Sequence, residues 1–203
     1  MRKSIALFST LAGLLVALAS TPVAKADAAG SVDFFAGQKE LDKNFTEGNK
    51  MEEQDALALF TDWGSSNSQW RLAVDILAGS KDVDDDELNV KLDGSTGEIG
   101  AGARWYPMKE SHWMPHLGAG LALVSGKIET SQPGPGDVDL AFDDSKLGYW
   151  TDGGIAYRFG EHFKLGGRIR YSDAKLEIRD NLDNVREVNA GGLSYGVTAG
   201  ATW

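Results

Sequence analysis

Charged residues of both signs recur at alternate positions in segments that otherwise consist of apolar and very small residues. The segment "QWRLAVDILAG" places Arg71 and Asp75 on one side of an extended chain, and Leu72 and Val74 on the other. Successive side chains of a β-strand point to opposite faces, so such charges would share one face. Two kinds of site fit them: ion pairs that neutralise one another in a packed interior, or the polar lining of a narrow pore. The residues expected to form this lumen charge network are Arg71, Asp75, Glu98, Arg104, Asp152, Arg158, Arg168 and Arg170, and Asp33, Lys39, His116 and Lys164 are expected on the same face.

The three histidines are the residues that a catalytic site for acyl-ester chemistry would need. Acyl-ester chemistry needs a nucleophile, a histidine and an orienting carboxylate within hydrogen-bond reach of one another. His112, His116 and His162 fall in or near short predicted turns at one end of the fold. We therefore expect surface or interior histidines, no enzyme activity and no cofactor, and we keep a lipid-modifying enzyme as the least favoured hypothesis.

The acidic run "DVDDDE" is the best candidate for a cation site. Clustered carboxylates can hold Ca²⁺ or Mg²⁺. However, the run lacks the glycine and the terminal glutamate spacing of a calcium-binding loop. We expect a solvated loop and predict no metal site, and cation binding by this run is left open. Its carboxylates are Asp82, Asp84, Asp85, Asp86 and Glu87.

Strands must position all of these groups, because a period of two runs through the chain. It is clearest in "LSYGVTAGATW", where Leu193, Val197 and Trp203 alternate with glycine, serine and threonine. A face this small and polar suits the inside of a narrow barrel whose outside meets hydrocarbon. Eight such segments are expected: Ser31–Leu41, Asp55–Trp63, Gln69–Gly79, Gly97–Pro107, Trp113–Leu123, Leu147–Phe159, Phe163–Ser172 and Leu193–Trp203.

The connections between these segments alternate between short and long. In an up-and-down barrel, all short turns then lie at one rim and all long polar loops at the other. Aromatic residues on the apolar face gather beside the short turns, as expected for a girdle at a membrane boundary. This periplasmic aromatic girdle is expected to comprise Trp63, Trp70, Trp105, Trp113, Phe159, Phe163 and Trp203. The fold class predicted is an all-β, eight-stranded, antiparallel up-and-down transmembrane β-barrel.

The N-terminus predicts secretion. A basic start, an apolar run and the small-x-small pattern at Ala24 and Ala26 are typical of a signal peptide, so we expect residues 1–26 to be removed and residues 27–203 to form one barrel domain. Removal of three basic residues lowers Lys+Arg from 20 to 17 against 30 Asp+Glu, which shifts the net charge from -10 to -13. Such an acidic chain excludes a nucleic-acid partner, and the absence of cysteine excludes disulfides.

The chain resembles the small outer-membrane β-barrel proteins of Gram-negative bacteria, of the eight-stranded OmpA, OmpX and opacity-protein type. The likeness rests on the terminal strand ending in Trp203, on "YWTDGGIAYRFGEHFKLGGRIRYSDA" from Tyr149 to Ala174, and on the signal peptide. It implies that the C-terminal strand is recognised by the barrel assembly machinery, although phenylalanine is commoner than tryptophan at its last position. It also implies outer-membrane lipids and lipopolysaccharide as surroundings.

Such folds host several functions, so the fold alone does not decide the role. The function expected is a structural or surface-interaction role of a monomer through acidic extracellular loops. A narrow pore for small solutes is the alternative.

Overall fold

The computed structural model describes residues 28–41, 53–85, 90–108, 111–131, 140–179 and 185–203, and every element in them is a β-strand. No helix among these residues is long and apolar enough to span a membrane. The strands are β1 (Ala28–Leu41), β2 (Glu53–Ser65), β3 (Trp70–Asp85), β4 (Val90–Trp105), β5 (Trp113–Ser131), β6 (Leu140–Phe159), β7 (Phe163–Asp173), β8 (Lys175–Arg179), β9 (Val185–Asn189) and β10 (Gly192–Thr202). The predicted signal peptide lies outside the described residues.

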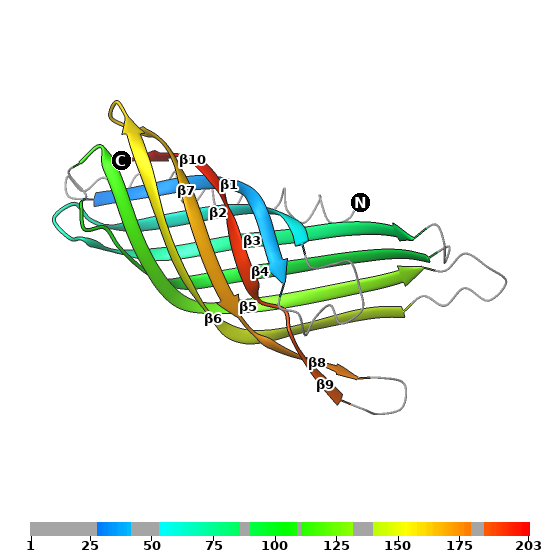
Figure 1. Cartoon of the computed structure of the whole chain (residues 1–203). Helices are drawn as coiled ribbons and strands as arrows, with labels where there is room; N and C mark the ends of the chain where they lie inside the picture. The colour runs from blue at the N-terminus through cyan, green and yellow to red at the C-terminus, as the bar shows by residue number, and fades with distance from the viewer. Residues whose placement is uncertain (1–27, 42–52, 86–89, 109–110, 132–139, 180–184) are drawn as a thin grey trace.

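Eight strands form a closed barrel in the order β1-β10-β7-β6-β5-β4-β3-β2, while β8 and β9 form a separate two-stranded sheet (Figure 1). All pairings are antiparallel, and the barrel closes where β1 pairs with β10, from Ser31 opposite Thr202 to Leu41 opposite Gly192. Closure leaves no edge strand in the wall, which is the condition for strands to cross a bilayer. The predicted fold class is confirmed.

The apolar and polar faces of the strands lie as the alternation predicts. Leu72, Leu121 and Val197 are 61%, 58% and 64% exposed on the outside of the barrel. Arg71 and Arg168 are buried inside it, at 6% and 3% exposure. A soluble barrel would show the reverse, because water would strongly disfavour an apolar outer surface. The outer surface is therefore built to meet hydrocarbon.

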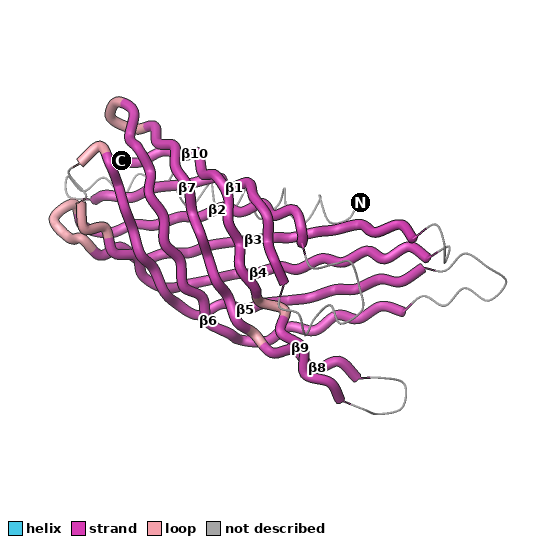
Figure 2. The backbone as a smooth tube through the Cα atoms, viewed as in Figure 1, coloured by secondary structure: helices cyan, strands magenta, loops and turns pink. Residues whose placement is uncertain are grey.

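Short turns join the strands at one end of the barrel (Figure 2). The turn between Phe159 and Phe163 contains Gly160 with a φ of +66°, a conformation that only glycine adopts without strain. The C-terminal end of β10 reaches the same rim, where Trp203 exchanges backbone hydrogen bonds of 3.0 and 3.1 Å with Gly30. We call this end of the barrel the short-turn rim.

The long connections differ from the prediction, which made them loops. The β3–β4 pairing continues to Asp85 opposite Val90, and the β5–β6 pairing continues to Thr130 opposite Leu140. A third connection contains the β8–β9 hairpin. Most of the fourth, residues 42–52, lies outside the described residues. Three connections predicted to be loops are thus largely β-hairpin, because antiparallel pairing can extend past the membrane wherever the register is already set.

Candidate functional site

A chain of ion pairs crosses the barrel interior from one rim toward the other. Nine charged side chains alternate in sign along it, and each contacts the next. The N···O distances are 2.9 Å for Lys164–Asp33, 3.4 Å for Asp33–Arg168, 3.3 Å for Arg168–Asp152, 2.8 Å for Asp152–Arg104, 2.6 Å for Arg104–Asp75, 2.8 Å for Asp75–Arg170, 3.4 Å for Arg170–Glu98 and 2.7 Å for Glu98–Lys39. All nine side chains are at most 4% exposed, so each charge depends on its neighbours for compensation.

The far end of this chain is held by polar groups from other strands. Glu98 also accepts a hydrogen bond of 2.6 Å from the Ser172 hydroxyl. The Lys39 ammonium donates to the backbone carbonyl of Ala190, 3.2 Å away. Because Lys39 and Ser172 lie on β1 and β7 and Glu98 on β4, these contacts span the lumen.

A second cluster occupies the short-turn end of the interior, around the buried carboxylate of Asp62. Asp62 Oδ2 accepts hydrogen bonds from the hydroxyls of Ser31 and Tyr106, at 2.7 and 2.6 Å, and Asp62 Oδ1 pairs with Arg71 at 3.0 Å. The Arg71 guanidinium lies 4.5 Å from the centre of the Tyr106 ring. Burial, followed by the nearby Asp62 carboxylate, raises the pKa of Tyr106 well above its ordinary value. The Tyr106 hydroxyl therefore stays protonated and remains a donor.

Aromatic rings separate the guanidinium groups of the central layer. The Phe60 ring centre lies 4.1 Å from the Arg168 guanidinium carbon, and the Trp150 ring centre lies 4.5 Å from that of Arg170. A cation over a ring face is attracted by the ring quadrupole. Phe60 and Trp150 are fully buried, so the interior is a mixed aromatic and ionic core.

Glycines on β4 and β5 make room for Trp150. A Cβ added to Gly100, Gly102 or Gly120 would come within 2.9, 2.8 and 2.8 Å of the indole. The Trp150 ring nitrogen donates to the Leu121 carbonyl at 3.1 Å. The glycines on the inner face of β4 and β5 therefore leave space for the Trp150 side chain, and this explains why glycine alternates with apolar residues in these strands.

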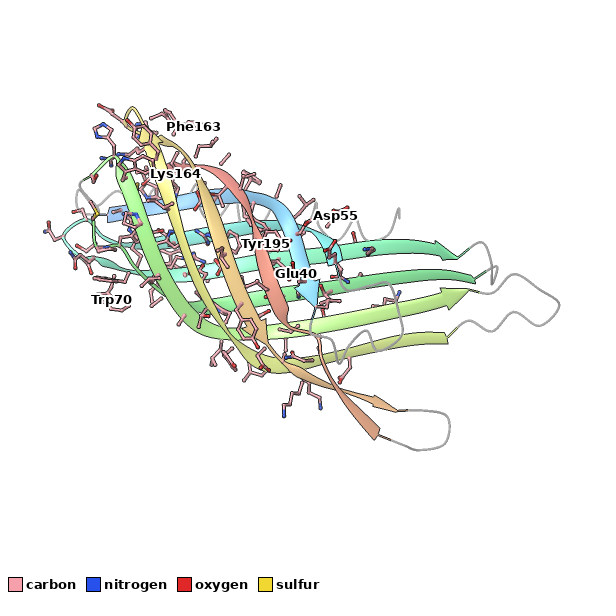
Figure 3. All side chains as sticks on the ribbon, viewed as in Figure 1. Glu40, Asp55, Trp70, Phe163, Lys164 and Tyr195 are labelled. Atoms are coloured by element: carbon pink, nitrogen blue, oxygen red, sulfur yellow. The ribbon has the colours of Figure 1, made fainter. Side chains whose placement is uncertain are left out.

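Aromatic side chains surround the short-turn rim on its outside. Trp70 lies opposite Trp105 and Phe159 opposite Phe163, with ring centres 6.4 and 6.0 Å apart. Trp63, Trp113 and Trp203 are about half exposed on the same outer face. Figure 3 shows Trp70 and Phe163 at this end of the barrel. The seven residues thus lie at the rim and on the face where a membrane boundary would need them.

An outer tyrosine group, which the sequence did not predict as a group, lies nearer the opposite rim. The Tyr195 hydroxyl lies 3.1 Å from Gln38 Oε1 and from Glu40 Oε1, and the hydroxyls of Tyr149 and Tyr171 each lie 3.4 Å from Asp173 Oδ2. From Phe163 to Tyr171, β7 spans nine residues between the two aromatic levels, which matches the 9 to 11 residues of a transmembrane strand. The signal in the sequence is that Tyr171 on β7 and Tyr195 on β10 occupy odd-numbered positions, which face outward like the apolar residues of these strands.

The interior residues expected from the sequence fall into two sets. Arg71, Asp75, Glu98, Arg104, Asp152, Arg168 and Arg170 are buried and paired inside the barrel. Arg158 shares their face but forms no ion pair with any residue that the structure describes. Asp62 and Tyr106 were missed, although the alternation that places Arg104 inside also places Tyr106 there.

The histidines are spread along the short-turn end. His116 is buried beside Tyr106, with ring centres 5.5 Å apart, whereas His112 and His162 are exposed. Residues Gly192 to Gly196 match the Gly-x-Ser-x-Gly pattern of hydrolases, but they form the first part of strand β10, which begins at Gly192 with a φ of +144°, and not a strand-to-helix turn. Ser194 is buried in the lumen.

The acidic run was predicted to lie in a loop, and this is wrong for its first half. Asp82, Asp84 and Asp85 belong to β3, with Asp82 opposite Asp93 of β4. Asp86 and Glu87 lie outside the described residues. Among the residues that the structure covers, no three His, Asp or Glu side chains are arranged to hold a metal ion.

A closed eight-stranded barrel with an apolar outside, an ionic core and an aromatic rim defines a transmembrane barrel of the bacterial outer-membrane class. The family profile of the outer membrane protein beta-barrel domain matches residues 6–198, and the chain belongs to this family. The protein is therefore an outer-membrane protein that sits among the lipids and lipopolysaccharide of that membrane.

Solved structures share this fold at low sequence identity. Ail, the attachment invasion locus protein of Yersinia pestis, solved in complex with the heparin analogue sucrose octasulfate, is 14% identical over 87% of this chain and 99% of its own, with a TM-score of 0.58. OprG of Pseudomonas aeruginosa is 17% identical over 88% and 97%, with a TM-score of 0.54. Neisserial surface protein A is 19% identical over 84% and 95%, with a TM-score of 0.52. No curated protein matches the sequence.

Proposed function

We propose that this protein mediates interactions at the cell surface, through an acidic sheet that extends from the barrel wall. The observation behind the proposal is the length of four neighbouring strands. The pairing of β3 with β2 stops at Ser80, and the pairing of β6 with β7 stops at Tyr149, yet β3, β4, β5 and β6 remain paired with one another beyond these points. Figure 1 shows the four strands running together past β1 and β2. We call this part the projecting sheet.

The charge of the projecting sheet indicates what kind of partner it would take. In the sequence, residues 81–93 contain six acidic and two basic residues, and residues 127–146 contain five acidic and two basic residues. The acidic residues that lie in the described strands are Asp82, Asp84, Asp85, Asp93, Glu129, Asp143 and Asp144. Outer-membrane barrels place their long connections outside the cell, so this charge would face the surroundings. An acidic surface attracts basic partners over long range and repels anions. We therefore propose a basic protein surface as the partner and do not transfer the polysulfated ligand of Ail to this chain.

Binding of an oligolysine peptide to the full chain in lipid nanodiscs tests this proposal. Neutralising Asp82, Asp84 and Asp85 to asparagine should weaken binding several-fold at low salt, and added salt should weaken binding to the unchanged protein. The matched control neutralises Glu40, Glu53 and Asp55, three exposed carboxylates on the barrel wall. Equal loss in the two triple variants would contradict a role of the projecting sheet.

A narrow pore is the second candidate, and buried polar atoms in the lumen favour it. Asp33 Oδ1, Asp75 Oδ1, Asp152 Oδ1 and Gln54 Nε2 are among the buried polar atoms without a hydrogen-bond partner in the described residues. Ordered water is the usual partner of such atoms, which suggests a hydrated path beside the ion pairs. If the path conducts, planar bilayers will show channels whose ion preference changes with Arg168→Gln or Glu98→Gln. If the bilayers show no channel conductance, the pore is contradicted and the ion pairs block the lumen.

We also propose the processing and assembly expected from the sequence. The short-turn rim faces the periplasm, the barrel is a non-catalytic monomer, and its last strand, β10, is the segment recognised by the barrel assembly machinery. Intact mass measurement of the protein from outer membranes should show a chain that begins at Asp27. A mass that includes residues 1–26 would contradict signal-peptide removal.

A further inference from the structure

Positive charge exceeds negative charge among the described residues of the barrel interior, and the cation without an ion-pair partner there, Arg158, lies at the short-turn end. The chain of nine charges contains five cations and four carboxylates, and the Arg71–Asp62 pair is balanced. Arg158 adds one more cation without an ion-pair partner among the described residues. Unbalanced charge in a protein interior is costly, so this end of the barrel requires a counter-charge.

Two cations face each other directly across neighbouring strands at this position. Arg158 of β6 is paired in register with Lys164 of β7, and Gly166 separates Lys164 from Arg168 on the inner face of β7. Like charges in directly opposite positions of a sheet destabilise it. Lys164 and Arg168 both contact Asp33, at 2.9 and 3.4 Å, and Arg168 also contacts Asp152 at 3.3 Å. No further carboxylate of the described residues contacts Arg158.

Buried nitrogen atoms without partners accompany this excess charge. Arg158 Nε, Arg168 Nε and His116 Nε2 are buried and form no hydrogen bond with the described residues. Both arginine atoms are obligatory donors, and the imidazole nitrogen donates in one of its two tautomers. His116 and Arg168 both lie opposite Gly154 in the register, and Arg158 lies on the same inner face nearer the short-turn rim. Donors of this kind from β5, β6 and β7 suit an oxyanion with several acceptor oxygens.

From this arrangement we propose an oxyanion site inside the short-turn mouth of the barrel, formed by Arg158 and Lys164 with support from Arg168 and His116. The ligand is a small phosphate-bearing or carboxylate-bearing anion. The arginine supplies planar paired donors, which match the oxygens of phosphate and carboxylate, and the lysine supplies a point charge. Because these side chains face the lumen, the anion enters from solution and not from the surrounding lipid. Arg158 is half-buried and is thus reachable from the mouth.

Inorganic phosphate is the probe for this site. Isothermal titration calorimetry of the full chain in detergent micelles, with phosphate as the titrant, should show binding. Chloride at equal ionic strength should not reproduce this binding. Arg158→Gln should weaken phosphate binding about 10- to 100-fold, since it removes charge-assisted hydrogen bonds. The control is Lys81→Gln. It removes a positive charge from the end of β3 that lies far from the short-turn rim, so phosphate affinity should be unchanged.

Reversing the charge at Arg158 distinguishes loss of the anion site from a general loss of structure. Arg158→Glu places a carboxylate opposite Lys164, so the variant should bind no phosphate and yet unfold at a higher temperature than Arg158→Gln in phosphate-free buffer. Phosphate should raise the unfolding temperature of the unchanged protein and not that of Arg158→Glu. Equal phosphate affinity in the unchanged protein and Arg158→Gln would overturn the proposal, as would phosphate binding that chloride reproduces.

Discussion

Arg104 shows how single residues hold this barrel together. Its guanidinium is completely buried and lies 2.6 and 2.8 Å from the carboxylates of Asp75 and Asp152, which come from two other strands. Each carboxylate has one further arginine partner, Arg170 or Arg168. The middle of the interior is therefore a network in which each charge has two ion-pair partners, as the contacts from Asp33 to Glu98 show.

Replacing Arg104 by leucine should destabilise the folded barrel by about 3 kcal/mol, because it leaves two buried carboxylates under-compensated. Arg104→Lys keeps the charge but loses the planar pair of donors, so its effect should be smaller. Urea unfolding in lipid vesicles measures the stability of both variants, with heat-dependent migration in gels as the readout of the folded fraction. An Arg104→Leu barrel as stable as the unchanged protein would mean that the network contributes little to stability.

The residues of this network could be predicted from the sequence, but their pairing could not. Alternation determines which face Asp75 or Arg104 occupies, since the period of a strand is two. The level of each side chain along the barrel axis depends on the stagger between strands, which no local pattern encodes. Arg170 and Asp75 are separated by 95 residues in the sequence and meet only because of that stagger.

At the scale of elements, β4, β5 and β6 fit together through size complementarity. The glycines of β4 and β5 receive the Trp150 side chain of β6, and a Cβ on Gly100 would come 2.9 Å from both Trp150 Nε1 and Arg170 Nη2. Side chains alone fill this space, so a larger residue at position 100 requires them to move.

Gly100→Val should therefore destabilise the barrel by about 1 to 3 kcal/mol through overpacking. Combining it with Trp150→Leu should cost less than the sum of the two single changes, since the smaller side chain frees the space that valine needs. Gly153→Ala is the outward-facing control and should have little effect, because its nearest neighbour is the tip of Leu117. Strict additivity of the two interior changes would show that Gly100 and Trp150 do not share this space.

The projecting sheet should be dispensable for the barrel itself. Replacing residues 81–93 by a short turn leaves the β3–β4 pairs from Trp70 to Ser80 intact, so unfolding in urea should change by less than about 1 kcal/mol. Heat-dependent migration in gels checks that the barrel still closes. A variant that fails to close would show that the hairpin contributes to folding as well as to the surface.

The extension of these strands could not be predicted from the sequence. The alternation of apolar and small residues exists only where one face meets lipid, and it ends near Ala78 on β3. Beyond that point the sequence loses this alternation, and a run such as Asp84, Asp85 and Asp86 has the composition of a loop. Backbone pairing inherited from the wall keeps Asp82 to Asp85 in a strand in spite of their low strand propensity.

The whole molecule combines an apolar outside with a core of charges and aromatic rings. Five of the six tryptophans lie at the short-turn rim on the outer face, whereas Trp150 is buried in the lumen. This distribution assigns the two kinds of tryptophan to two environments, interfacial lipid and protein interior.

Single-tryptophan variants test that assignment directly. With all other tryptophans changed to phenylalanine, the fluorescence of Trp70 should be quenched by lipids brominated near the headgroup. Fluorescence of Trp150 in the corresponding variant should be insensitive to brominated lipids at any depth. Strong quenching of Trp150 would contradict an interior position for this side chain and, with it, the orientation of both faces of the wall.

The pairing of β1 with β10 has a consequence for biogenesis. The two strands that close the cylinder are the first and the last of the wall, separated by some 150 residues of chain. Until the C-terminal strand arrives, every partly assembled sheet has two open edges whose amide and carbonyl groups hydrocarbon cannot satisfy. β10 must therefore be in place before the last backbone seam can form, and hydrogen bonding along that seam satisfies the final open edges of the wall.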